Sequence, residues 1–220
     1  MFKNMAKRLV AACGLLLSAS SQAGFISFDD LTPNVYGDGE LVAVDSTFLL
    51  STNGLGLIGD ALSCFVAQCP SGNDSQSWYA LNDGGFNLHR GDNGAMQLFG
   101  FDVAYVAAFP IFAPETLLGR ILVDAYSSTG AWLNTWQFDL PTQSADGNFY
   151  FAHIDVSALQ ISGHSFRFSS CTFDEFGDCQ SSYYGLNQFA IDNIHVPTAP
   201  ALTLFVLGLA GLVSLRRRAQ

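Results

Sequence analysis

The sequence predicts an all-β protein, an antiparallel β-sandwich of the jelly-roll type, placed between two targeting segments. Short stretches of alternating apolar and polar residues recur along residues 24–196, and clusters of Gly, Asn, Asp and Ser separate them, a spacing typical of sandwiches. Gly, Asn or Asp interrupts every candidate helical stripe within about ten residues. We therefore expect a signal peptide over residues 1–23, one β-domain over 24–196 and a membrane-seeking C-terminal segment over 197–220.

Each expected strand is a run of alternating residues that ends at a turn-forming cluster. In chain order the strands are expected at residues 24–29, 40–50, 77–81, 96–105, 119–126, 131–140, 148–155, 165–169 and 188–196. The clearest turns are predicted at residues 82–85, 91–94, 127–130 and 146–148, because Asn, Asp and Gly favour turn conformations.

The first 23 residues read as a secretory signal peptide. Three cationic residues precede an apolar stretch from Leu9 to Ala19, and Ser21-Gln22-Ala23 places small residues at both positions that a signal peptidase reads,. We expect export by the Sec pathway and cleavage after Ala23, so that the mature chain begins at Gly24.

The C-terminal end carries an apolar segment marked by prolines. Val196 and Pro197 lead toward an apolar run from Leu202 to Leu215, with Pro200 just before the run and Arg216-Arg217-Arg218 after it. A comfortable bilayer span needs about 20 apolar residues, and this segment is slightly shorter. Basic residues remain on the cytoplasmic side, so we expect transient anchoring in the inner membrane with the arginines in the cytoplasm.

This arrangement resembles the PEP-CTERM sorting signal of Gram-negative bacteria that make exopolysaccharide. The resemblance covers Val196 to Arg218 and implies processing by an exosortase, a membrane protease-transpeptidase, and delivery to the cell surface or extracellular matrix. Family members usually read Val-Pro-Glu-Pro, whereas Thr198-Ala199-Pro200 follows Val196-Pro197 here. The alternative interpretation is an ordinary C-terminal membrane anchor.

The body between the two segments is strongly acidic. Six of the nine Lys and Arg residues lie in the targeting segments, which leaves Arg90, Arg120 and Arg167 against 19 acidic residues, a formal charge of −16. Nucleic-acid binding depends on cationic contacts to phosphates, so we expect no nucleic-acid partner. The same charge disfavours anionic membrane surfaces and favours divalent cations and uncharged polymers.

Four cysteines in the body indicate an oxidising compartment. Three connectivities are possible, and we favour two local disulfides, Cys64 with Cys69 and Cys171 with Cys179. Each would stabilise the fold by about 2 to 2.5 kcal/mol on the chain-entropy estimate. A four-cysteine zinc site is the alternative, although zinc sites usually use more closely spaced pairs.

Acidic residues lie in both terminal stretches of the body. Phe25 to Leu31 opens the domain and Phe189 to Val196 closes it, and this bracketing resembles the jelly-roll modules of carbohydrate-binding and MAM-type extracellular domains. The resemblance implies that the first and last strands lie side by side, and that Asp29 or Asp30 and Asp192 hold a structural calcium. The alternative is that Asp30 caps a turn and Asp192 marks a β-bulge.

Aromatic residues are candidates for sugar binding. Trp132, Trp136 and Phe138 share parity on one expected strand and would point to one face. They would form either a platform for sugar rings or, as we favour, part of the core. Two pairs, Trp78-Tyr79 and Tyr183-Tyr184, are better candidates for exposed loop aromatics.

Sequence signatures of catalysis are scarce. The body has three widely separated glutamates, scattered histidines, and no serine in a Gly-x-Ser-x-Gly motif,. We therefore expect a non-catalytic surface or matrix protein that associates with exopolysaccharide or biofilm, with carbohydrate binding as a candidate role. The alternative is a secreted polysaccharide hydrolase on the same scaffold.

Overall fold

Fourteen β-strands and one short 3-10 helix make up the part of the chain that the computed structural model describes, residues 24–60, 68–107, 117–180 and 186–197. The strands are β1 (Phe25–Ile26), β2 (Asn34–Tyr36), β3 (Leu41–Ala43), β4 (Phe48–Gly59), β5 (Ser77–Arg90), β6 (Met96–Leu98), β7 (Gly100–Tyr105), β8 (Gly119–Tyr126), β9 (Trp132–Asp139), β10 (Ala152–Asp155), β11 (Ile161–Gly163), β12 (Ser165–Phe173), β13 (Cys179–Gln180) and β14 (Phe189–His195), and the helix is η1 (Ser157–Leu159).

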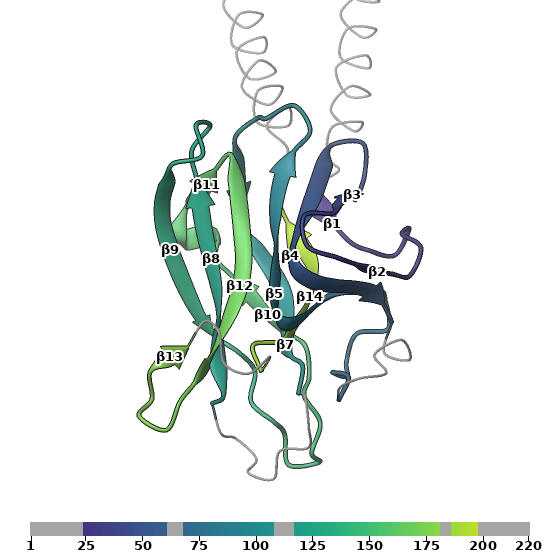
Figure 1. Ribbon diagram of the computed structural model, residues 1–220, viewed down its shortest axis with the longest axis vertical. Coiled ribbons are helices and arrows are strands. Elements are labelled where there is room, and N and C mark those ends of the chain that lie inside the picture. Colours follow the sequence, from purple (N-terminus) through teal and green to yellow (C-terminus); the bar gives the residue numbers. More distant parts are fainter. Residues whose placement is uncertain (1–23, 61–67, 108–116, 181–185, 198–220) are drawn as a thin grey trace, which may run out of the picture.

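Twelve strands form one antiparallel sheet that folds over into two layers. Its main hydrogen-bonded order is β10-β7-β14-β5-β12-β8-β9, with β4 also paired to β5. In Figure 1 the strands β9, β8, β12, β5 and β4 face the viewer, and β10, β7 and β14 lie behind them. We call these the front sheet and the back sheet. The predicted antiparallel β-sandwich of jelly-roll type is confirmed.

Strand β5 connects the two layers by bending at its centre. Its first half pairs with β14 and its second half with β12. The bend falls at Asn82 and Asp83, whose φ angles are 51° and 61°, and a side chain at Gly85 would collide with the backbone of Phe168. The turn predicted at residues 82–85 is therefore wrong, because left-handed residues and glycine bend this strand while it stays paired with β4,.

Aromatic packing joins the two layers. Phe168 of β12 stacks on Phe86 with ring centroids 4.9 Å apart and meets Phe101 of β7 edge-on at 5.6 Å. Trp78 and Tyr79 are also buried, which contradicts their prediction as exposed loop aromatics. Their strand is covered on both faces, Trp78 by the main core and Tyr79 by a smaller apolar cluster. The other predicted pair, Tyr183-Tyr184, lies outside the described residues.

The first and last strands of the domain lie side by side. Phe25 is opposite His195 and Ile26 is opposite Ile194 in the antiparallel pair of β1 and β14, as the sequence predicts. The register of β14 against β7 shifts between Asp192 and His195, and Asn193 has a φ of 50°. The predicted β-bulge at Asp192 is therefore confirmed.

One of the two predicted disulfides is confirmed. Cys171 of β12 bonds to Cys179 of β13, with Cα atoms 5.3 Å apart. The loop between them is organised by Asp174, whose Oδ1 accepts hydrogen bonds from the backbone N–H groups of Phe176 and Asp178, each 2.9 Å away. Cys64 lies outside the described residues, so its pairing with Cys69 stays a prediction.

The expected strand boundaries differ from the structure at several places. The single strands expected at residues 40–50 and 96–105 are each divided, into β3 and β4 and into β6 and β7, whereas the expected strand 119–126 coincides with β8. No helix among the described residues is long and apolar enough to cross a membrane. The predictions for Ala23, Pro200 and residues 216–218 concern residues that are not described.

Candidate functional site

A row of polar side chains crosses the five strands of the front sheet. Neighbouring strands place its members directly opposite one another; in order across the sheet they are Thr135, Asp124, Arg167, Asn87 and Ser51. Asp124, Arg167 and Asn87 each lie between two buried apolar residues on their strands, so they point away from the core, and Thr135 and Ser51 continue the row on the same face. We call this set the polar row.

The members of the polar row bond to one another and to one neighbour. Thr135 donates a hydrogen bond to Asp124, and Asn87 donates one to Ser51 across 3.3 Å. With its amide oxygen turned toward the guanidinium group, Asn53 accepts bonds from Nε and Nη2 of Arg167, at 2.9 and 3.1 Å. The face therefore offers carboxylate, amide, hydroxyl and guanidinium groups close together, the kinds of group that bind sugar hydroxyls.

Trp132 stands at the edge of this face. Its side chain is 59% exposed, and its indole Nε1 donates a hydrogen bond to Thr135 Oγ1 across 3.1 Å. A register shift in β9 places Trp132 opposite Tyr126. The Trp132 side chain therefore lies on the opposite face of the strand from Trp136 and Phe138. The prediction of a core role is confirmed for Trp136 and Phe138, which pack against the core, and is wrong for Trp132 because of this bulge.

A buried carboxylate, Asp192, lies on β14, the last strand, which pairs with the first strand β1. We call the region around it, with Asn73, Ser75, Gln76 and Asp29, the Asp192 junction. Asp192 is fully buried, and its Oδ2 accepts hydrogen bonds from Asn73 Nδ2 at 2.8 Å and Ser75 Oγ at 2.7 Å. Its Oδ1 has no hydrogen-bond partner among the described residues. Burial raises the pKa of Asp192, and the charge of Asp29 raises it further, because both disfavour the ionised form.

Asp29 reaches the same region, and Asp30 does not share its contacts. Asp29 Oδ1 accepts a hydrogen bond from the backbone N–H of Gln76 at 3.0 Å, and Gln76 Nε2 donates one to the Asp29 carbonyl at 3.1 Å. Asp30 is exposed. Sequence reasoning missed Asn73, Ser75 and Gln76, although the turn-forming run from Ser71 to Ser75 is visible in the sequence.

Metal binding at the Asp192 junction could use amide, hydroxyl and backbone oxygens as well as carboxylates. Among the described residues, no group of three or more His, Cys, Asp or Glu side chains is placed to hold a metal ion. Calcium also accepts amide, hydroxyl and backbone oxygens, and the buried Oδ1 of Asp192 and Oε1 of Gln76 both lack hydrogen-bond partners in the described structure. Calcium at Asp29 and Asp192 stays a prediction, which these two oxygen atoms favour.

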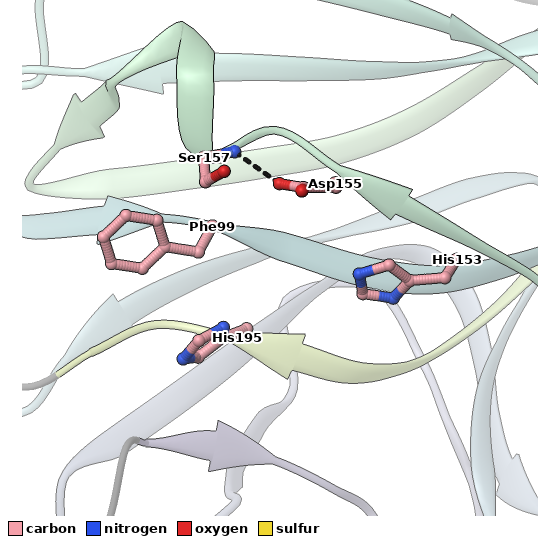
Figure 2. A pocket seen from close by; sticks show the side chains of 5 residues that line it. All are labelled: Phe99, His153, Asp155, Ser157 and His195. Atoms are coloured by element: carbon pink, nitrogen blue, oxygen red, sulfur yellow. Dashed lines mark hydrogen bonds between the residues drawn. The ribbon is translucent and has the colours of Figure 1, made fainter.

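A pocket of about 360 Å³ opens on the back sheet (Figure 2). Its lining residues come from segments far apart in the sequence; they are Phe99, His153, Asp155, Ser157 and His195. The sequence indicated scattered histidines, but β10 and β14 both pair with β7 and bring His153 and His195 to one pocket. Strand order across the sheet, which the sequence does not show, produces this site.

Comparisons with known proteins bear on the fold alone. No family model and no curated protein matches the chain. A DUF4465 family protein from Bacteroides caccae is similar in structure over 79% of this chain and 97% of that protein, with 12% identity and a TM-score of 0.53. At that identity the similarity shows a shared fold.

A glycosidase and a bacteriophage tailspike domain are more distant in structure. An arabinose-bound α-L-arabinofuranosidase aligns over 81% of this chain and 27% of the enzyme, with 9% identity and a TM-score of 0.41. The enzymatically active domain of tailspike protein 4 from bacteriophage CBA120 aligns over 81% of this chain and 21% of that domain, with 14% identity and a TM-score of 0.29. Both differ too much in overall shape to support a conclusion about this chain.

Proposed function

We propose that this protein is an exported, non-catalytic surface or matrix protein that binds polysaccharide through the outward face of its front sheet. The signal peptide carries it through the Sec pathway, and the PEP-CTERM-like tail holds it in the inner membrane until an exosortase-type enzyme processes it. Its polymer partner is the exopolysaccharide or biofilm matrix of the cell that makes it.

The observation that carries the proposal is the polar row beside an exposed tryptophan. The row extends across five strands, which neighbour one another at about 4.8 Å, so it is long enough to contact several sugar units of one chain. Aromatic faces stack on sugar rings, and the indole of Trp132 is held in place by its bond to Thr135. This combination of fixed aromatic and hydrogen-bonding groups is suited to binding rather than to bond cleavage.

The charge of the body narrows the class of polymer. Arg90 pairs with Asp92 at 2.7 Å and Arg120 pairs with Asp139 at 2.8 Å, while Arg167 contacts the amide of Asn53. Two of the three body arginines are therefore neutralised by carboxylates, and the domain repels anionic polymers over long range. Neutral or cationic polysaccharides fit this field, and nucleic acid does not.

Polysaccharide binding by the full-length chain in detergent tests the proposal. Affinity electrophoresis in gels that contain the host exopolysaccharide should show retardation of the wild type and at least about tenfold weaker binding by Trp132→Ala, the order of effect expected for an exposed stacking aromatic at a binding face. Phe176→Ala is the matched control, because Phe176 is 82% exposed on a loop remote from the polar row. Equal binding by all three proteins would refute the face, and released reducing ends would show a hydrolase instead.

We also propose that a structural calcium ion binds at the Asp192 junction. Asp192 and Asp29 would supply carboxylate oxygens, and Gln76 an amide oxygen. A buried carboxylate with one unbonded oxygen is costly, and a divalent cation would remove that cost.

Processing of the tail is testable separately. Mass spectrometry of the exported protein should show loss of the segment after about Pro197, as the resemblance to PEP-CTERM proteins implies. An intact C-terminus at Gln220 in exported material would contradict exosortase-type processing and favour a permanent anchor.

A further inference from the structure

A glycine lies between the two strands that carry Asp155 and His195 to the pocket. Gly100 of β7 lies between Asp155 of β10 and His195 of β14, which are its partners on either side. A Cβ atom at Gly100 would stand 3.0 Å from His153 Cε1 and 3.0 Å from the Ile154 carbonyl oxygen. The absence of a side chain at Gly100 therefore leaves room for the His153 ring beside the pocket.

His153 is held in one orientation beside this space. Its Nδ1 bonds to Asp102 Oδ1 at 2.7 Å, and Asp102 Oδ2 accepts a second bond from Asn193 Nδ2 at 2.8 Å. Both carboxylate oxygens of Asp102 are thus engaged, and Nδ1 of the imidazole is occupied. Nε2 of His153 remains as the polar atom that a ligand in the pocket can use.

Aromatic rings form another wall. The His195 ring stacks on Phe25 with centroids 4.4 Å apart and planes at 10°, and it lies 5.4 Å from Phe99. Phe25 is 57% exposed. Flat faces of this kind attract both the C–H face of a sugar ring and a nearby ammonium group.

The pocket is acidic. Asp155 Oδ1 accepts a hydrogen bond from the Ser157 backbone N–H at 2.8 Å, and Figure 2 shows this carboxylate at the pocket wall. Hydrogen bonds to Ser157 lower the pKa of Asp155, and His153 and His195 lower it further, so its carboxylate is ionised at neutral pH. The lining contains no Lys or Arg.

We propose that this pocket binds the protonated amine of an unacetylated amino-sugar residue. The ammonium group bonds to the Asp155 carboxylate, the sugar ring lies against Phe99 and His195, and a ring hydroxyl bonds to Nε2 of His153. The volume of about 360 Å³ is at the small end of ligand sites, which span roughly 300 to 1,000 Å³, and suits one sugar unit. This inference rests on the proposed function and specifies the polymer as one that contains free amino sugars.

Proton NMR of the histidine rings tests the pocket directly. D-glucosamine, added at pH 7 to the full-length chain in detergent, should shift the ring signals of His153 and His195 and leave those of His89 and His164 in place. Asp155→Asn keeps the acceptor for the Ser157 N–H and should weaken glucosamine binding at least about tenfold, because it removes one charge-assisted hydrogen bond. Asp178→Asn, on an exposed loop, should bind like the wild type.

Two neutral sugars complete the test. D-glucose and N-acetyl-D-glucosamine at the same concentration should leave the His153 and His195 signals unchanged, because neither carries an ammonium group. Equal shifts with all three sugars, or none with glucosamine, would overturn the inference. If Trp132→Ala nevertheless weakens polysaccharide binding at least about tenfold, the proposed function stands without the pocket. If glucosamine binds but Trp132→Ala does not change polysaccharide binding, the proposal of a binding face on the front sheet would be refuted. The proposal of an amino-sugar site in the pocket would stand.

Discussion

The front face and the Asp192 junction both carry polar side chains on strands of one sheet, and they differ in exposure. On the front face, Asn87 and Arg167 are half-buried, bond to neighbours and also reach water. At the junction, Asp192 is enclosed and one of its oxygens lacks a hydrogen-bond partner. Polar groups in water exchange partners at little cost, whereas a buried unpaired oxygen carries a full desolvation cost. The front face should therefore affect binding, and the junction should affect stability.

Calcium binding at the Asp192 junction should have the largest effect on the free energy of unfolding. At a concentration 100 times its dissociation constant, calcium should raise the free energy of unfolding by about 2.7 kcal/mol, as measured by urea unfolding in calcium and in EDTA. Asp192→Asn should abolish the difference, and Asp178→Asn should preserve it. Identical unfolding curves of the wild type in calcium and EDTA would remove the cation site.

Loss of the disulfide between Cys171 and Cys179 should have the next largest effect on the free energy of unfolding. Cys179→Ser should lower the free energy of unfolding by about 2 kcal/mol, because the unfolded chain regains the entropy of an open loop. Dithiothreitol should lower the stability of the wild type by more than it lowers that of the variant, because the variant lacks this disulfide. Polysaccharide binding at temperatures below unfolding should persist, since β13 lies outside the polar row. A loss of binding in the folded variant would show that the two regions are coupled.

The pH dependence in EDTA should isolate Asp192. Its pKa is raised in the folded protein, so the ionised carboxylate destabilises the fold at pH 7, and this penalty disappears as the pH falls through the folded pKa toward about 4, the unfolded value. Asp192→Asn should thus be more stable than the wild type at pH 7, by about 1.4 kcal/mol for each unit of pKa shift. The difference should vanish near pH 4. A constant difference across this range would contradict a buried charge.

The front face should give the smallest change in stability. Asn87→Ala should alter the free energy of unfolding by less than about 0.5 kcal/mol, as most surface substitutions do, and should weaken polysaccharide binding several-fold. Phe176→Ala serves again as the control for binding. A large loss of stability in Asn87→Ala would show that the polar row supports the fold rather than a ligand.

Regular strands could be predicted from the sequence, and irregular ones could not. Strand β8 alternates without interruption between buried and half-buried residues, so its boundaries were predictable. Asn82-Asp83-Gly84-Gly85 suits a hairpin turn and a corner equally well, and only the continuous partner strand β4 decides between them. Trp132 faces outward because of a bulge in its pairing with β8, which sequence parity does not reveal.

The neighbours within a site could be predicted only where the resemblance implied that the first and last strands lie side by side. The pairing of β1 with β14 follows from the resemblance and places Asp29 near Asp192, yet Asn73 and Ser75 reach Asp192 from a distant loop. His153 and His195 become neighbours through β7, which lies between their strands. No local spacing in the sequence encodes either contact, because both depend on strand order.

The position of β14 has a mechanical consequence. This strand, which leads to Val196 and Pro197, is hydrogen-bonded to β7 along one side and to β5 and β1 along the other. A pull on the chain beyond Pro197 acts along the strand and loads both rows of hydrogen bonds at once, in shear. A domain tethered by this end would resist flow far better than one whose last strand lay at a free edge and peeled away bond by bond.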